Sequence, residues 1–175
     1  IEYCAGGGID FLVWGYGHEV VDFYNPWNLT LADLVGFDVA VVTSNCSFSQ
    51  SENIGNVLKE FADAGGGVVL TQFAFMDGPA LTGGIMSPGY SPFTVNPFWD
   101  YTYFDVLGTV HDSGSPLMSG VNPFGVYGYY QANVQVQGAA TLVADWSSGY
   151  PAVGYNATGS SSAVVGVNLF PPYSW

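Results

Sequence analysis

The sequence has almost no positive charge. It contains no Arg, and Lys59 is its only cation, whereas 14 acidic residues give a formal net charge of −13. Nucleic-acid binding needs clustered Lys and Arg to displace counterions, and anionic lipid surfaces attract the same residues. We therefore exclude nucleic acids as partners and expect no clamp for phosphorylated substrates. The acid excess favours contact with neutral ligands or divalent cations.

Long hydrophobic runs are missing as well, so we expect no membrane insertion. The 175 residues are 49% hydrophobic and 17% aromatic, which is enough for one domain with a full core and argues against disorder. Because internal repeats and linkers are absent, residues 1–175 are predicted to form a single domain. Charged residues make up only 9% of the chain. A surface built mainly of Ser, Thr, Asn, Gly and Tyr is common on secreted proteins; alternatively, glycans or neighbouring subunits cover it.

The clearest local pattern is strand, helix, strand. Residues 37–43 (FDVAVVT) form a continuous apolar run typical of a buried parallel strand. Residues 49–64 carry apolar side chains at helical spacing, and three glycines end this predicted helix. Residues 68–73 are predicted to form the next buried strand. These lengths indicate a right-handed parallel crossover.

The second half of the chain has a different character. Residues 76–103 are rich in Pro, Gly and aromatics and are too long for a plain connection, so they are predicted to be a functional insertion or a surface that packs on another protein. Beyond them, short strand-like segments alternate with Gly, Ser and Asn turns. They predict an antiparallel meander that closes one edge of the sheet, with strands at residues 129–137, 141–146, 152–155 and 163–170.

Three segments resemble a known fold. They are GHEVVDFYNPWNLTLADLVGFDVAVVTS, GNVLKEFADAGGGVVLTQFAF and LGTVHDSGSPLMSGV. In this order they resemble the class I glutamine amidotransferase-like superfamily, and in particular its non-catalytic relatives in large secreted bacterial proteins. The resemblance implies an α/β fold with a flavodoxin-like parallel sheet flanked by helices. The antiparallel strands would extend this sheet at the C-terminal end of the chain.

The enzymes of that superfamily place a Cys on the turn after a strand, and this chain departs from them there. After residues 68–73 no Gly-x-Cys-x-Gly occurs, and Gln72, Phe73 and Ala74 occupy the turn. The Gly-x-Ser-x-Gly elbow of hydrolases is absent too. We therefore transfer no catalytic residue and expect that the protein is not an enzyme.

Histidines offer little chemistry either. His111 precedes Asp112, and such a pair is a candidate general base, but no nucleophile can be assigned to it. With His18 as the only other histidine and no ligand spacing, both are interpreted as structural, and we expect no metal site and no cofactor.

Two cysteines and three sequons bear on the compartment. In the flavodoxin-like order implied by the resemblance, Cys4 and Cys46 follow neighbouring strands, which makes a disulfide sterically reasonable. The alternative is two buried free thiols in a cytosolic protein. Sequons at Asn28, Asn45 and Asn156 are candidates for N-glycosylation if the chain enters a glycosylating secretory pathway.

Aromatic side chains between Gly and Pro are the main candidates for recognition. They suit a protein interface or sugar stacking, and the alternative is a satellite core beneath a long loop. The candidates are Tyr90, Phe93, Phe98, Trp99, Tyr101, Tyr103, Tyr127 and Tyr129.

Together these features predict a non-catalytic extracellular structural or adhesive domain. It would be a subunit or repeat unit of a glycosylated surface assembly or filament, located outside the cell or at its surface. Its partners would be further copies of itself or other surface proteins, and glycans are a further candidate. The alternatives are a carbohydrate-binding or carbohydrate-processing accessory domain and a hydrolase with an unrecognised site.

Overall fold

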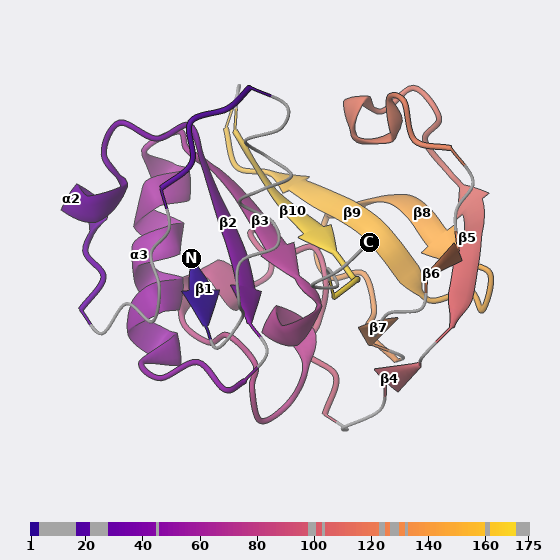
Figure 1. The fold of residues 1–175 in the computed structure, drawn as a ribbon, viewed down its shortest axis with the longest axis horizontal. Helices are drawn as coiled ribbons and strands as arrows, with labels where there is room; N and C mark the ends of the chain where they lie inside the picture. Colours follow the sequence, from indigo (N-terminus) through magenta and orange to yellow (C-terminus); the bar gives the residue numbers. More distant parts are fainter. Residues whose placement is uncertain are drawn as a thin grey trace.

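The computed structural model describes most of the chain, and everything below refers to these residues: 1–3, 17–21, 28–44, 46–97, 101–102, 104–122, 125–126, 130–131, 133–159 and 162–170. Its centre is one mixed sheet of eight strands in the order β1-β2-β3-β10-β9-β8-β5-β6 (Figure 1). In that order the strands are Glu2–Tyr3, Val39–Ser44, Gly67–Thr71, Ala163–Val167, Pro151–Ala157, Thr141–Trp146, Asp105–Val110 and Gly125–Val126. A separate pair joins β4 (Tyr101–Thr102) to β7 (Tyr130–Gln131).

The sheet has a parallel half and an antiparallel half. Strands β1, β2, β3 and β10 run parallel, and every pairing from β10 to β9, β8, β5 and β6 is antiparallel. The C-terminal strand β10 therefore returns to the middle of the sheet and joins the two halves. It pairs with β3 on one side, Val165 opposite Val69, and with β9 on the other, Val165 opposite Tyr155.

The predicted flavodoxin-like architecture is wrong. The described residues contain only two α-helices, α2 (Leu31–Leu34) and α3 (Ser51–Asp63), so the fold is richer in sheet than a parallel sheet flanked by helices. After β3 the chain enters the short 3₁₀ helix η1 (Gln72–Phe75) and then irregular structure, not a second crossover helix. Four prolines between residues 79 and 97 explain the difference, because proline removes a backbone donor and breaks helices.

The strand–helix–strand unit, in contrast, forms where the periodicity placed it. The apolar stripe of α3 buries Ile54, Leu58 and Phe61 against β2 and β3. The helix ends at Asp63, and Gly65 with φ of +102° follows, a backbone conformation that glycine adopts without steric penalty. No described helix has the length and hydrophobicity that crossing a membrane requires.

The segment 76–97 belongs to the core and is not a protruding insertion. Leu81, Ile85 and Phe93 are fully buried in the same cluster as the stripe of α3. The short 3₁₀ helices η2 (Gly84–Met86) and η3 (Pro116–Met118) complete the described elements. Helix α3 and this segment therefore share the covering of one face of the sheet, with η2 packed directly on α3.

Candidate binding sites

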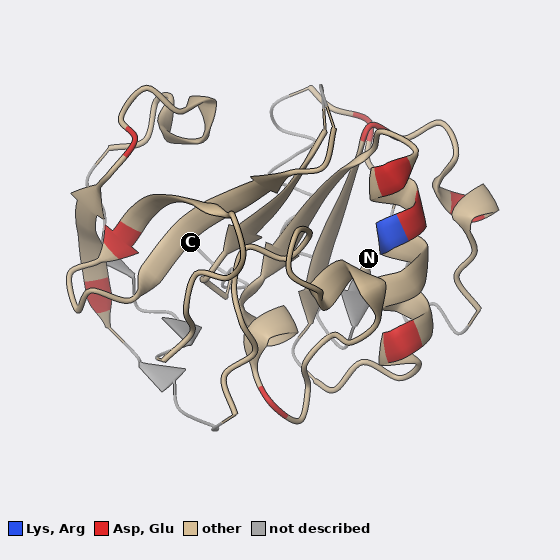
Figure 2. Ribbon diagram, turned by 180° about the vertical axis from the view of Figure 1, so that it is seen from behind, with Lys and Arg blue, Asp and Glu red and all other residues tan. Residues whose placement is uncertain are grey.

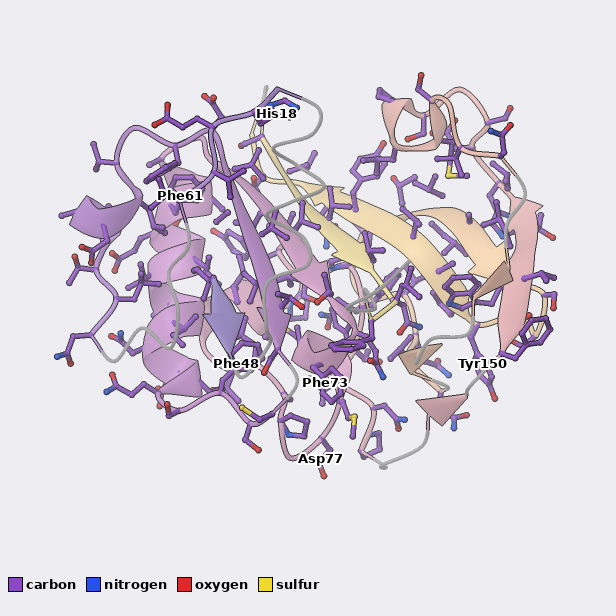
Figure 3. The ribbon with its side chains drawn as sticks, in the orientation of Figure 1. His18, Phe48, Phe61, Phe73, Asp77 and Tyr150 are labelled. Carbon is purple, nitrogen blue, oxygen red and sulfur yellow. The ribbon has the colours of Figure 1, made fainter. Side chains whose placement is uncertain are left out.

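The carboxyl ends of the parallel strands form the first candidate site. In open α/β sheets, ligands bind outside these strand ends. Helix η1 follows β3 directly and places Gln72 and Phe73 at this edge. Phe73 is half-buried and meets Phe170 edge-on, with the ring centroids 5.2 Å apart (Figure 3). Neither an amide nor a phenyl ring serves as a nucleophile or proton carrier, so this turn offers contact and not covalent chemistry.

The side chain of Gln72 is unusual because it is fully buried and unpaired. Its exposed fraction is 0%, and neither Nε2 nor Oε1 has a hydrogen-bond partner among the residues the structure describes. The hydroxyl of Thr43, near the end of the neighbouring strand β2, is in the same state. The backbone N–H of Gln72 is already used, since it donates to the carbonyl of Leu169 at 3.3 Å. A buried polar group left unpaired costs about 1–3 kcal/mol, so this position calls for an explanation.

The histidine–carboxylate pair lies in the antiparallel half of the sheet. His111, just after β5, places Nε2 2.5 Å from Oδ2 of Asp145 on β8. Asp112, the neighbour considered from sequence, instead accepts from the backbone N–H of Gly114 at 3.2 Å. The imidazole is 40% exposed and pins the end of β5 to β8. His18 is exposed, and no group of three or more His, Cys, Asp or Glu side chains suited to a metal ion occurs among the described residues.

A groove at the opposite end of the parallel strands is the second candidate site. Its volume is about 810 Å³, and its lining is mostly aliphatic side chains and glycine backbone. It opens where β2, β3 and β10 begin, between the α2 region and the end of α3. Two valines on its lining are well exposed, Val35 at 73% and Val39 at 51%, and Leu117 from η3 is 37% exposed. Exposed aliphatic side chains around a hollow are typical of protein contact surfaces.

The charge around this groove is negative. Figure 2 shows acids on α2 and α3 beside the one cation. Asp33 on α2 accepts hydrogen bonds from the hydroxyl and the backbone N–H of Thr30, which lower the pKa of its carboxyl. Lys59 is held 2.6 Å from Asp63; this contact raises the pKa of the lysine and lowers that of the aspartate. Lys59, the only Lys or Arg of the chain, is thus paired with an acid on its own helix.

The structure tests one half of the predicted disulfide. Cys46 takes part in a disulfide, and β1 and β2 are hydrogen-bonded neighbours, with Tyr3 opposite Ser44. Cys4, the predicted partner, lies outside the described residues. Its pairing with Cys46 therefore stays a prediction.

The three sequons differ in access. Asn28 is exposed, whereas Asn45 lies outside the described residues. Asn156 on β9 is only 5% exposed, and its Nδ2 donates to the carbonyls of Tyr90 and Ser91 at 3.1 and 3.0 Å. Because Nδ2 is the atom to which a glycan attaches, a glycan at Asn156 is incompatible with this structure.

The structure describes the side chains of two of the aromatic candidates, Phe93 and Tyr90. Phe93 is 0% exposed in the main core cluster, where its ring can reach neither an interface nor a glycan; this cluster is not the satellite core considered as the alternative. Tyr90 is half-buried: its hydroxyl donates to Asp63 at 2.5 Å, and Lys59 lies over its ring at 4.8 Å. Tyr101 lies in β4, with its side chain not described. The remaining candidates lie outside the described residues: Phe98, Trp99, Tyr103, Tyr127 and Tyr129.

Sequence reasoning located the turn of the first site but missed the burial of Gln72, and it missed the groove altogether. Gln72 sits directly after a buried strand, but nothing in the sequence indicates that its amide is buried without a partner. The groove combines residues from 31–39, 61–69 and 162–165 with Leu117, and these segments meet only in the fold.

Comparison with known proteins identifies the fold and not the family. No protein-family model matches the chain, and no curated protein matches it. Similar solved structures include the cytoplasmic protein STM3548 from Salmonella typhimurium (TM-score 0.66, 14% identity, covering 93% of this chain and 76% of that one). Two others are glycosidases: an exo-β-1,4-mannosidase from Opitutaceae bacterium strain TAV5 (0.59, 13%, 91% of this chain) and a β-galactosidase from Rahnella sp. R3 (0.53, 16%, 92%). The chain spans only 25% and 23% of these two enzymes, respectively.

Proposed function

We propose that this chain is a non-catalytic domain that works through contact with other proteins, as a structural or adhesive unit of an extracellular surface assembly. The apolar groove at the start of β2, β3 and β10 carries this proposal. Val35 and Val39 are exposed there, and burying them against another molecule is favourable by the hydrophobic effect. The carboxyl edge supports it too, because Gln72 and Phe73, which follow β3 there, carry no nucleophilic or proton-transferring group.

Replacing Val39 by asparagine is expected to weaken assembly. Val39 is the first residue of β2 and is 51% exposed on the groove, so the change removes apolar contact area and leaves the core unaltered. We expect the midpoint concentration of assembly, measured by light scattering on a dilution series, to rise about tenfold, corresponding to 1.4 kcal/mol.

Val106→Asn is the matched control, since Val106 is also an exposed strand valine, on β5 and outside the groove. It is expected to leave the midpoint unchanged. Equal effects of the two substitutions, or a wild-type chain that stays monomeric at every concentration, would contradict the proposal.

Salt is expected to promote this assembly if the partner is a second copy. Each copy carries a formal charge of −13, so copies repel one another at low ionic strength. Raising the salt from about 10 mM to about 150 mM shortens the screening length from about 30 Å to about 8 Å and weakens that repulsion. Light scattering at both salt concentrations measures the effect, and assembly that weakens with salt would show that attraction between charges, not burial of apolar side chains, holds the copies together.

A carbohydrate-binding or carbohydrate-processing accessory role is the second candidate. It is supported by the similarity to portions of a mannosidase and a galactosidase and by the half-buried Phe73 at the carboxyl edge. Affinity electrophoresis in gels that contain mannan or galactan tests it. Retardation that is lost on Phe73→Ala favours this candidate, whereas unretarded migration in both gels favours the first.

The intact mass of the native protein tests the compartment. A Cys4–Cys46 disulfide gives a mass lower than that of the reduced chain by two hydrogen atoms, and a glycan at Asn28 or Asn45 adds hexose and N-acetylhexosamine increments. We expect this deficit of two hydrogen atoms together with glycan on one or both of these residues. Peptide mapping is expected to find Asn156 unmodified, because its Nδ2 is buried and hydrogen-bonded.

A further inference from the structure

We propose that the buried amide of Gln72 binds a hydroxyl group, that of an internal water, at the carboxyl edge of the parallel strands. Gln72 has an exposed fraction of 0%, and both polar atoms of its side chain lack a partner among the described residues. Groups buried in this way are rare, because native structures pair nearly all buried polar atoms with protein or with ordered water.

The chemistry of the amide selects the ligand. Nε2 is a donor and Oε1 is an acceptor, so one small group satisfies both only if it accepts and donates at once. A hydroxyl does this. A carboxylate only accepts and leaves Oε1 unpaired, and an ammonium only donates and leaves Nε2 unpaired. The net charge of −13 disfavours an anion further.

The surroundings of Gln72 fit a hydroxyl-bearing ligand. The backbone N–H of Gln72 is bonded to the carbonyl of Leu169, which fixes the residue between β3 and β10. Phe73, the next residue, is half-buried at the same edge and carries no polar group that could pair with the amide. A second unpaired polar group, the hydroxyl of Thr43, lies near the end of the adjoining strand β2. The edge thus combines an amide, an aromatic ring and a hydroxyl, all uncharged.

This site is separate from the groove. The groove opens where β2, β3 and β10 begin, and Gln72 lies just beyond the residue at which β3 ends. Failure of the Gln72 proposal therefore does not affect the proposed contact function, and failure of the assembly test does not affect the proposal for Gln72.

Gln72→Met tests the proposal, because methionine has nearly the same length and carries no amide. If the amide holds a hydroxyl, the variant loses those hydrogen bonds, and its melting temperature is expected to fall by about 3–6 °C. If the amide is truly unpaired, an apolar side chain of the same shape relieves it, and the melting temperature stays the same or rises. The second result would overturn the proposal.

Gln137→Met calibrates the experiment. Nε2 of Gln137 donates to the carbonyls of Met86 and Phe93 at 3.2 and 2.9 Å, so this amide is satisfied within the protein. Gln137→Met is therefore expected to lower the melting temperature by about as much as Gln72→Met does.

Two added solutes separate the sources of the hydroxyl. Methyl β-D-glucopyranoside is the neutral probe, and D-glucuronate is its anionic counterpart. A neutral probe that raises the melting temperature of the wild type but not of Gln72→Met would show that the amide is open to a saccharide and would overturn the enclosed water. An equal rise in both is the general effect of an excluded solute and is the expected result.

If Gln72→Met does not fold, nuclear Overhauser effects from the Gln72 amide protons of the wild type decide. Effects to water support the proposal, whereas effects to the glycoside, or no effects to either, overturn it.

Discussion

Replacing Gly55 by alanine is expected to destabilise the protein by at least about 3 kcal/mol, although the same change stabilises an ordinary helix interior by about 1 kcal/mol. Gly55 lies in the middle of α3, where the segment that ends in η2 crosses the helix. A Cβ atom added there would stand 1.7 Å from the carbonyl oxygen of Thr82 and 3.2 Å from Cγ2 of Ile85. The obstructing atom belongs to the backbone, so no rotamer change removes the clash and the whole segment must shift.

Urea denaturation of Gly55→Ala and of Gly65→Ala measures the effect. Gly65 has φ of +102° and no atom within 4 Å of an added Cβ, so alanine there meets only the backbone penalty of about 1 kcal/mol. The free energy of unfolding is expected to be highest for the wild type, lower for Gly65→Ala and lowest for Gly55→Ala. A Gly55→Ala variant as stable as the wild type would show that residues 80–86 do not dock on α3 as described.

The periodicity of the sequence was sufficient for the local elements of the parallel half. The apolar spacing of α3 and the continuous run of β2 each depend on neighbouring residues, and both formed near the predicted bounds. Among the antiparallel strands, 141–146 was predicted with the bounds that β8 has. In each case, a local pattern of apolar residues predicted the element without reference to long-range contacts.

The order of the strands was not predictable in this way. The closing strand was expected at an edge of the sheet, but β10 inserts between β3 and β9 and pairs parallel with β3. The prolines after β3 exclude a second crossover helix, so the chain crosses to the antiparallel half and returns to β3 only at its end. Pairing between strands so distant in sequence depends on tertiary packing, which local patterns do not encode.

The candidate site could be predicted only as far as its location. The turn after β3 was recognised as the place where chemistry would sit, and the residues there exclude a nucleophile. Burial of Gln72 was not foreseeable, because glutamine is mostly exposed in proteins. The groove was equally hidden, since Val39 and Leu117 meet only when β2 and η3 are in place.

Replacing Phe93 by alanine is expected to lower the free energy of unfolding by about 4 kcal/mol. Phe93 is 0% exposed and meets Phe75 edge-on, with the ring centroids 5.4 Å apart. The opposite side of its ring faces the backbone of Gly154 and Gly166, which are paired in neighbouring strands. Truncation leaves a cavity that the sheet cannot close, because backbone in a hydrogen-bonded ladder relaxes little. Phe104→Ala is the control: Phe104 is 54% exposed, and its loss is expected to cost under about 1 kcal/mol.

A double-mutant cycle shows whether the ring and the glycine are matched to each other. A Cβ added at Gly154 would stand 2.9 Å from Cε1 of Phe93, so Gly154→Ala alone forces the ring to move and is destabilising. With Phe93→Ala in place, the same methyl group enters the vacated space, and the combined loss should be about 2 kcal/mol smaller than the sum of the two single losses. Additive losses would mean that the ring is not packed on the sheet, and Phe93 would return to the surface residues considered for an interface. The expected coupling instead makes Phe93, together with the hydrogen bonds of Asn156, an attachment of segment 76–97 to β9 and β10, which leaves the proposed contact function to the groove at the far end of the strands.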